Sequence, residues 1–428
     1  MVIAKIKTVL NKDITKVFSQ NAMATLVRIL TGFVSVKTVA IIIGPAGVAL
    51  LGQLNNFSTI FLTLSTGGIN TGVTKYVAEN AGSQKKINVF LRTALWITLV
   101  LSLLCALILV GGSAYFTRII LKDIKYQSVI IVFGITIFLY ALNAILLSVL
   151  NGYKQYKKYV WVNISGSLVS LLFSTSLAYY YNIYGALLAA VTYQSVVFVV
   201  TVFFAIRCNW FSRKNFLGRF SKTAGKKLAS YSLMAIISAA IVPVSQLIIR
   251  GYMVNHTSLE EAGIWEGMNR ISSMYLMVIT SSLAIYYLPR MAEIKTDWEM
   301  RREIFSAYKL IVPPLLIATV CIYLFRHFII HALFNKAFTA MEHLFAFQLL
   351  GDFFKICSWL LGYQIVAKSM TKLFIITEVL FSLSLVGLSA LFINIYSNMG
   401  ATIGYALNYL MHFIVMLIVF RKLIFSKS

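Results

Sequence analysis

Two long stretches of the chain carry no charge. Residues 159–206 contain no Asp, Glu, Lys or Arg, and neither do residues 379–420. A helix that crosses a lipid bilayer needs about 20 residues, so each stretch has room for two such helices around a short turn. Residues that favour turns lie within each stretch: Asn182, Tyr184 and Gly185 in the first, and Asn398 and Gly400 in the second. Both stretches therefore predict helical hairpins in lipid.

The composition of the whole chain agrees with a lipid environment. Of its 428 residues, 59% are hydrophobic and 12% are charged, and the mean hydropathy is +0.83, whereas soluble domains carry roughly a quarter charged residues. Backbone groups in lipid must find partners internally, so only helix bundles and closed barrels span membranes. The apolar runs here are continuous rather than alternating, which favours helices. We predict an all-α polytopic membrane protein of about twelve transmembrane helices, near 19–43, 48–74, 93–117, 128–150, 159–180, 184–206, 228–249, 264–289, 310–325, 344–367, 373–394 and 399–420.

The positive charge is distributed as a topology signal. The formal net charge is +25, and outside the predicted spans 28 Lys and Arg lie on the side of the N-terminus while 6 lie on the other side. Cytoplasmic loops of membrane proteins carry such an excess. We therefore expect a multi-pass protein of the bacterial inner membrane with both termini in the cytoplasm. The basic loops would meet anionic lipid headgroups, and no nucleic-acid partner is expected.

The chain is expected to divide near its middle. Residues 1–18 alternate lysines with apolar residues, which suits a cytoplasmic amphipathic segment at the membrane surface. The densest basic loop, 208–227, suits a cytoplasmic linker between an N-terminal six-helix bundle, 19–207, and a C-terminal six-helix bundle, 228–428.

Two short motifs recur at nearly one offset, close to half the chain length. Ala46-Gly47-Val48 recurs as Ala262-Gly263-Ile264, 216 residues later, and Gly185-Ala186 recurs as Gly400-Ala401, 215 residues later. Two bundles of six spans each would both begin in the cytoplasm, so the repeat would be parallel. Transporters built from such repeats commonly rock one half against the other around a central cavity.

Charges predicted inside the membrane are candidate functional residues, because burying them in lipid is costly. Arg28 and Lys37 in the first span could bind an anionic headgroup such as a pyrophosphate; the alternative is that they snorkel to the interface. Nine positions separate them, about half a turn around an ideal helix, so they face one cavity only if the helix bends. Arg28 is the deeper of the two.

The C-terminal half has three further groups of candidate charges. Asp352 and Lys355 are three residues apart on one helix face and could form a structural ion pair or a coupling site. Glu266 and Arg270, four residues apart, could pair in the same way or contact a substrate. Glu378 has no basic neighbour in sequence and is a candidate proton carrier, unless another helix supplies its partner.

Uncharged and catalytic candidates are fewer. Asn56 and Asn70 could contact sugar hydroxyls, or form hydrogen bonds between helices. His327 and His331 have helical spacing but no accompanying H-E-x-x-H motif, so we predict no metal site and no cofactor. The longest predicted outside loop has roughly 18 residues, short for a catalytic loop. We therefore expect a protein without enzymatic activity.

Several segments together resemble one family. They read IGPAGVALLGQLNNF after the first span, NTGVTKYVAEN after the second, and later AGIWEGMNRIS, YYLPRMAEI, FTAMEHLFAFQLLGDFFK and GYQIVAKS. In this order they resemble the Wzx-type polysaccharide translocases of the multidrug/oligosaccharidyl-lipid/polysaccharide exporter superfamily. The nearest branch is that of the lipid III flippases of enterobacterial common antigen and related O-antigen translocases. The resemblance runs from about residue 20 to 420.

The resemblance implies a fold and a function. The fold would be two six-helix bundles that open alternately to either side of the membrane. The substrate would be an undecaprenyl-diphosphate-linked oligosaccharide, an O-antigen or common-antigen unit used in envelope polysaccharide biosynthesis, moved from the cytoplasmic to the periplasmic leaflet. Arg28, Lys37 and Lys355 would fit its cationic cavity by position. Partners would include the polymerase and the chain-length regulator of the glycan pathway, and an ion gradient could supply the energy.

Other functions remain as alternatives. A cation-coupled multidrug antiporter of the same superfamily should have acidic groups in its cavity, whereas the N-terminal half here contributes only basic ones. A lipid II flippase usually has two further helices, and an oligosaccharide polymerase needs a larger outside loop. A non-transporting scaffold of a glycan-assembly complex would tolerate neutral replacement of every buried charge.

Overall fold

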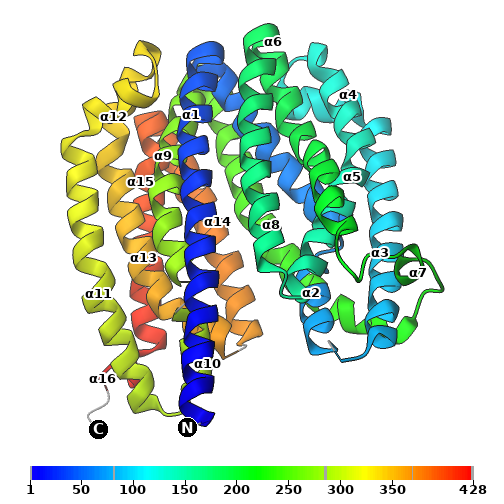
Figure 1. The fold of residues 1–428 in the computed structure, drawn as a ribbon. Coiled ribbons are helices and arrows are strands. Elements are labelled where there is room, and N and C mark those ends of the chain that lie inside the picture. The colour runs from blue at the N-terminus through cyan, green and yellow to red at the C-terminus, as the bar shows by residue number, and fades with distance from the viewer. Residues whose placement is uncertain (1, 81, 284–286, 369, 426–428) are drawn as a thin grey trace. The chain divides into compact units, whose positions relative to one another are not determined.

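The computed structural model describes residues 2–80, 82–283, 287–368 and 370–425, and every regular element in this part of the chain is a helix (Figure 1). The all-α prediction is confirmed. Among the described residues, nine helices are long and apolar enough to cross a membrane. Two of these, α1 (Val2–Ser65) and α6 (Tyr156–Ile206), each comprise two helices joined at a break, at Gly44 and Asn182 respectively. Helix α9 (Leu259–Ser282), whose glutamates and Arg270 make it more polar, lies outside that set but packs as a full-length helix.

The breaks have local causes. Gly44 adopts φ 64° and ψ −175°, which a residue with a side chain rarely adopts, and Pro45 follows it without a backbone N–H to continue the helix. Asn182 adopts φ 50° and ψ −132°. With these breaks, the helices account for the predicted membrane passes in order.

Contacts divide the chain into two compact units. Unit 1 comprises residues 1–42 and 54–240, and unit 2 comprises residues 43–53 and 241–428. The division falls within α8 (Lys222–His256), so the basic segment 208–227 belongs to unit 1. Helix α1 also runs from Val2 without interruption to its break at Gly44, so residues 2–18 continue directly into the first span.

Unit 1 holds the first half of the helices. Its further elements are α2 (Asn70–Glu79), α3 (Gln84–Gly111), α4 (Ser113–Phe116), α5 (Gln127–Gly152) and α7 (Arg213–Phe216), with short π and 3-10 turns at Thr117–Leu121 and Ile124–Tyr126. Its core lies where α2, α3, α5 and α6 meet, around Val73, Leu91 and Val149. The aromatic residue Trp210 stacks on Tyr153 and anchors the segment that follows α6 to this core.

Unit 2 repeats this arrangement. Besides α9 it holds α10 (Leu288–Glu293), α11 (Asp297–Leu324), α12 (Arg326–Leu333), the 3-10 segment Lys336–Leu344, α13 (Phe345–Ala367), α14 (Thr371–Tyr396), α15 (Asn398–Val419) and α16 (Arg421–Phe425). Helix α15 packs along both α13 and α14. A core around Met291, Leu360 and Ile365 lies where α10, α11 and α13 meet.

The later helices of the two units match in position along the chain. Helix α5 ends at Gly152 and α13 ends at Ala367, 215 positions later. Helix α6 begins at Tyr156 and α14 begins at Thr371, again 215 positions later. The hairpin break at Asn182 (φ 50°, ψ −132°) matches the one at Ser397 (φ 54°, ψ −136°). The offset of 215 is the one at which the Gly-Ala motif recurs. The structure thus carries the internal repeat that the sequence motifs indicated.

Some predicted span ends were wrong. The span predicted for 48–74 ends at Ser65, because Gly67 and Gly68 both adopt φ 63° and interrupt the helix before α2. The span predicted for 93–117 begins earlier, at Gln84, and ends at Gly111. The span predicted for 310–325 begins at Asp297, and Pro313 and Pro314 lie inside that helix.

Large apolar side chains cover the outer faces of the long helices. On α3 these include Leu103 and Leu107, and on α11 they include Leu310 and Ile317, each more than half exposed. Soluble monomers rarely expose apolar rows of this extent. These faces therefore suit contact with lipid.

Candidate functional site

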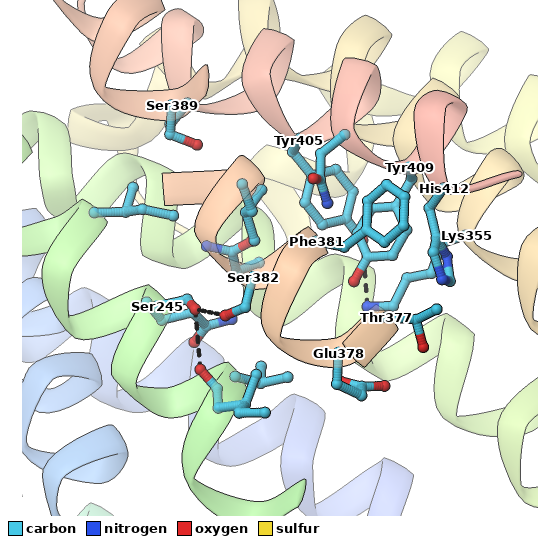
Figure 2. Close-up of a pocket in the computed structure, with 18 of the residues that line it drawn as sticks. Ser245, Lys355, Thr377, Glu378, Phe381, Ser382, Ser389, Tyr405, Tyr409 and His412 are labelled. Atoms are coloured by element: carbon cyan, nitrogen blue, oxygen red, sulfur yellow. Dashed lines mark hydrogen bonds between the residues drawn. The ribbon is translucent and has the colours of Figure 1, made fainter. Parts of the chain in front are cut away.

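A cavity of about 120 Å³ lies in unit 2 between α8, α9, α13, α14 and α15 (Figure 2). Polar, charged and aromatic side chains line it. They are Ser245, Gln246, Trp265, Asn269, Lys355, Trp359, Thr377, Glu378, Phe381, Ser382, Ser389, Tyr405, Asn408, Tyr409 and His412, together with apolar residues of α8 and α14. A water molecule needs about 10–15 Å³ of such space, so the cavity has room for a polar ligand group or a small water cluster.

Lys355 places its ammonium group among three aromatic rings of the cavity. Its Nζ lies 5.1 Å from the ring centre of Trp359, 5.6 Å from that of Tyr405 and 5.1 Å from that of Tyr409. It also donates a hydrogen bond of 3.3 Å to the Tyr405 hydroxyl (Figure 2). Ring faces attract a cation, so the cage holds the charge in place while leaving ammonium hydrogens available to a ligand.

Asp352 lies one helical turn away from Lys355 and is fully buried. Its carboxylate accepts hydrogen bonds from Ser272 (2.6 Å), Tyr275 and Tyr405 (2.7 Å). Three hydroxyl donors from two neighbouring helices therefore solvate this carboxylate within the membrane-spanning bundle.

The direct ion pair considered for Asp352 and Lys355 is not what the structure contains. The Tyr405 hydroxyl lies between them, since it donates to the Asp352 carboxylate and accepts from the Lys355 ammonium. The three-residue spacing places both groups on one face of α13, but the hydroxyl of Tyr405 from α15 occupies the position between them. The charges are thus linked through one phenol.

Glu378 and His412 complete the polar wall. Glu378 lines the cavity from α14, close enough to Lys355 for the two charges to interact. The ring of His412 packs at 4.4 Å from that of Phe381, and its Nδ1 is hydrogen-bonded to Ser358. Ser245 and Ser382 share a hydrogen bond between α8 and α14 (Figure 2). The basic group near Glu378 that the sequence did not supply therefore comes from α13.

A second charged cluster lies in unit 2 beside the cavity wall. Glu266 and Arg270, for which the spacing left an ion pair and a substrate contact open, form an ion pair, with the Arg270 Nε 3.2 Å from the carboxylate. Glu266 also pairs with Arg250 of α8, which is 1% exposed and reaches Gln53 at 3.1 Å. The guanidinium of Arg250 lies 5.4 Å from the ring centre of Trp265, a cavity wall residue. This cluster fixes the wall and joins residues 43–53 to α8 and α9.

The remaining candidates lie in unit 1. Arg28 and Lys37 are exposed on α1, and Arg28 is close enough to Tyr193 of α6 for its charge to act on that hydroxyl. Asn56 lies partly exposed on the second part of α1. Asn70 begins α2, and its side-chain oxygen is buried without a hydrogen-bond partner. The structure therefore groups Lys355, Glu378 and Asp352 around one site, and Glu266 and Arg270 beside it.

The histidine pair predicted to hold no metal lies on α12. The rings of His327 and His331 are 4.4 Å apart, and His327 lies 3.7 Å from Glu342. In the part of the chain that the structure describes, no group of three or more His, Cys, Asp or Glu side chains could hold a metal ion.

Sequence reasoning missed residues that act through tertiary contacts. Arg250 was placed just outside a predicted span, although α8 continues to His256. Tyr275 and Tyr405 lie far from Asp352 in sequence, so no local spacing linked them to it. Tyr405 gave a weak signal, because it lies one helical turn from Tyr409 on a helix without charged residues.

Replacing Asp352 by Asn is expected to destabilise unit 2. Three hydroxyls donate to the carboxylate, and the Gln348 amide lies 3.5 Å from it. An amide has one acceptor oxygen instead of two, so at least one buried donor loses its partner, at a cost of about 1–3 kcal/mol. Thermal unfolding of the detergent-solubilised protein measures the effect. Asp297→Asn, an exposed change in the same unit, is the control, and equal melting temperatures for the two variants would contradict the prediction.

An internally duplicated bundle of membrane helices around polar residues is the architecture of secondary transporters. The chain belongs to the polysaccharide biosynthesis protein family, whose pattern matches residues 14–295. It is 29% identical over 363 residues to the lipid III flippase of Escherichia coli (strain K12), an alignment that covers 84% of this chain and 86% of that protein. The lipid III flippase of Shigella flexneri matches to the same extent.

Solved structures share the fold. The inward-facing conformation of a multidrug resistance MATE family transporter of the MOP superfamily matches with a TM-score of 0.77 at 14% identity, over 95% of this chain and 96% of that one. The lipid II flippase MurJ in an inward closed conformation matches with a TM-score of 0.71 at 14% identity, over 94% of this chain and 87% of that one. These likenesses concern the fold alone.

Proposed function

We propose that this chain is a flippase for a lipid-linked oligosaccharide. The observation that carries the proposal is the 29% identity to lipid III flippases over most of both chains. The substrate would be an undecaprenyl-diphosphate-linked oligosaccharide, of the O-antigen or common-antigen type. Its transfer would run from the cytoplasmic to the periplasmic leaflet of the inner membrane, with both termini of the chain in the cytoplasm.

The physical problem that such a protein solves is the charge of the diphosphate. Moving an ion from water into hydrocarbon costs many kcal/mol. Basic groups in a polar cavity replace its hydration, while the polyprenyl tail stays in lipid. Arg28 and Lys37 are the proposed cationic contacts of the diphosphate, and Lys355, Asn56, Asn70 and Arg270 are the proposed further substrate contacts. No covalent step is required, so the protein needs two conformations and a difference in affinity between them.

Net direction requires a source of free energy. Glu378, Asp352 and Glu266 are the proposed coupling groups, since each is an acidic side chain within the helices of unit 2. A proton or sodium gradient would then drive alternating access. Removal of the product by a periplasmic polymerase, acting with a chain-length regulator, would also favour transfer in one direction.

Complementation tests this function. We expect the chain to restore surface glycan in a Gram-negative strain that lacks its own common-antigen and O-antigen flippases. Arg28→Ala and Lys355→Ala should lower the glycan at least tenfold at equal membrane abundance, because each removes a proposed substrate contact. Lys372→Ala, an exposed change at the start of α14, should leave the glycan unchanged.

The outcomes separate the parts of the proposal. Restored glycan that survives both variants would keep the flippase and remove the assigned residues. If no surface glycan appears with any glycan pathway supplied to the strain, although the protein inserts normally into the membrane, the flippase proposal is refuted. A drug antiporter or a scaffold would then be favoured. Export of cationic dyes by the same cells would then distinguish those two.

A further inference from the structure

The cavity of unit 2 contains polar atoms that no protein group satisfies. Asn408 Oδ1, Ser389 Oγ and Asn269 Nδ2 are buried without a hydrogen-bond partner, and all three residues line the cavity. Asn408 is 2% exposed and Ser389 is 1% exposed. Buried polar groups in proteins are nearly always hydrogen-bonded, so such a group calls for an explanation. One amide oxygen, one amide N–H and one hydroxyl together suit a ligand that both donates and accepts hydrogen bonds.

The fold does not require several of the charged and aromatic side chains that line this cavity. Through the 215-residue repeat, Trp359 corresponds to Ala144, Tyr405 to Ala190 and His412 to Val197. By the same correspondence, the charged pair Lys355 and Glu378 stands where unit 1 has uncharged Tyr140 and Asn163. Unit 1 forms the same helices and the same hairpin breaks without them. These two charges and three rings are therefore features of unit 2 beyond what its backbone needs.

The charges in the cavity limit the ligand. Lys355, Glu378 and His412 all line it, and the Tyr405 hydroxyl links Lys355 to the buried carboxylate of Asp352. A metal cation would meet the ammonium of Lys355, and a free diphosphate would meet the carboxylate of Glu378, so neither ion suits the site. An uncharged ligand with many hydroxyls can accept from the ammonium and donate to the carboxylate at once.

The shape of the walls points to a ring with both apolar and polar surfaces. Trp359, Tyr405 and Tyr409 surround one part of the cavity, and the rings of Tyr405 and Tyr409 lie 4.8 Å apart. Ligand sites commonly combine aromatic walls with a few placed polar groups that fix orientation. A sugar ring has apolar C–H faces that pack on aromatic rings and a rim of hydroxyls that donate and accept.

We propose that this cavity is a saccharide subsite that holds one uncharged sugar ring, between the aromatic side chains of α13 and α15 and the polar atoms of Asn269, Ser389 and Asn408. The proposal deepens the proposed function, because the lipid-linked oligosaccharide would supply the ring. The diphosphate would bind elsewhere. The Arg250–Glu266 pair serves the subsite by holding Trp265 in the wall.

Binding of free sugars to the purified full-length protein tests the subsite. The probes are methyl β-glucoside and methyl N-acetyl-β-glucosaminide, with sodium pyrophosphate as the anionic probe. Tryptophan fluorescence follows binding, since Trp265 and Trp359 line the cavity. We expect saturable binding of at least one glycoside, weakened about tenfold in Asn408→Ala and in Ser389→Ala, because each variant removes a hydrogen bond to the ligand. Asn143→Ala removes a buried amide of unit 1 whose oxygen has no hydrogen-bond partner, and this variant should bind as the wild type does.

Flipping is measured in proteoliposomes with the same preparations. The wild-type protein should move glycosylated undecaprenyl diphosphate faster than the sugar-free lipid, and Asn408→Ala should lose that preference. Binding of pyrophosphate alone, or intact flipping with no binding of either glycoside, would overturn the subsite while leaving the flippase in place. Glycoside binding without flipping of any lipid would refute the proposed function and keep the subsite.

Discussion

Glu266→Ala is expected to lower the free energy of unfolding by about 3–5 kcal/mol, because it leaves a buried arginine without its counter-charge. Arg250 is 1% exposed and has Glu266 as its carboxylate partner, with Gln53 as a further acceptor at 3.1 Å. Its Nε has no hydrogen-bond partner even with Glu266 present. The variant would also free Arg270, but that guanidinium is partly exposed and needs less compensation.

Thermal unfolding of the solubilised protein measures this loss. Glu260→Ala, an exposed change in the first turn of the same helix, controls for the helix dipole, which contributes about 0.3–1 kcal/mol. The double variant Arg250→Met/Glu266→Leu should recover most of the stability, because replacing both partners of a buried pair by apolar residues is often neutral. A loss with Glu266→Ala no greater than with Glu260→Ala would mean that the pair does not stabilise unit 2.

The order of the membrane helices could be predicted from the sequence because it depends on local composition. The charge-free stretches 159–206 and 379–420 became hairpins, with breaks at Asn182 and Ser397. Span ends were predicted less well. Hydropathy does not register backbone conformation, and the two positive-φ glycines Gly67 and Gly68 ended a helix inside an apolar run.

The candidate site was predictable only in part, because tertiary partners are not encoded in spacing. The four-residue spacing of Glu266 and Arg270 found a real pair but gave no indication of Arg250, a stronger partner from another helix. The three-residue spacing of Asp352 and Lys355 suggested a direct pair, whereas Tyr405 separates the two groups. Helical periodicity places side chains on a face, and packing against other helices decides what each one meets.

Gly185→Ala and Gly400→Ala are expected to destabilise the fold by similar amounts, more than about 3 kcal/mol each. At both positions the added methyl group would clash more severely than in ordinary overpacking of a core, which costs about 1–3 kcal/mol. A Cβ at Gly185 would lie 1.8 Å from the backbone oxygen of Leu177, and one at Gly400 would lie 2.1 Å from that of Phe392. Both contacts are with backbone, so no side chain can move aside. The equal effect follows from the repeat, since the two positions lie 215 residues apart behind the same hairpin break.

Control glycines in the same two helical hairpins make the comparison specific. Gly387 of α14 has open space around its Cβ position, and Gly166 of α6 has only ordinary contacts of 3.4 Å or more. Alanine at these positions should be neutral or stabilise by up to about 1 kcal/mol, since glycine weakens a helix interior. Melting temperatures and the yield of monodisperse protein report all four variants. A large loss of stability at Gly185 with none at Gly400 would contradict the prediction. The two hairpins would then share a backbone conformation but not the close packing behind it.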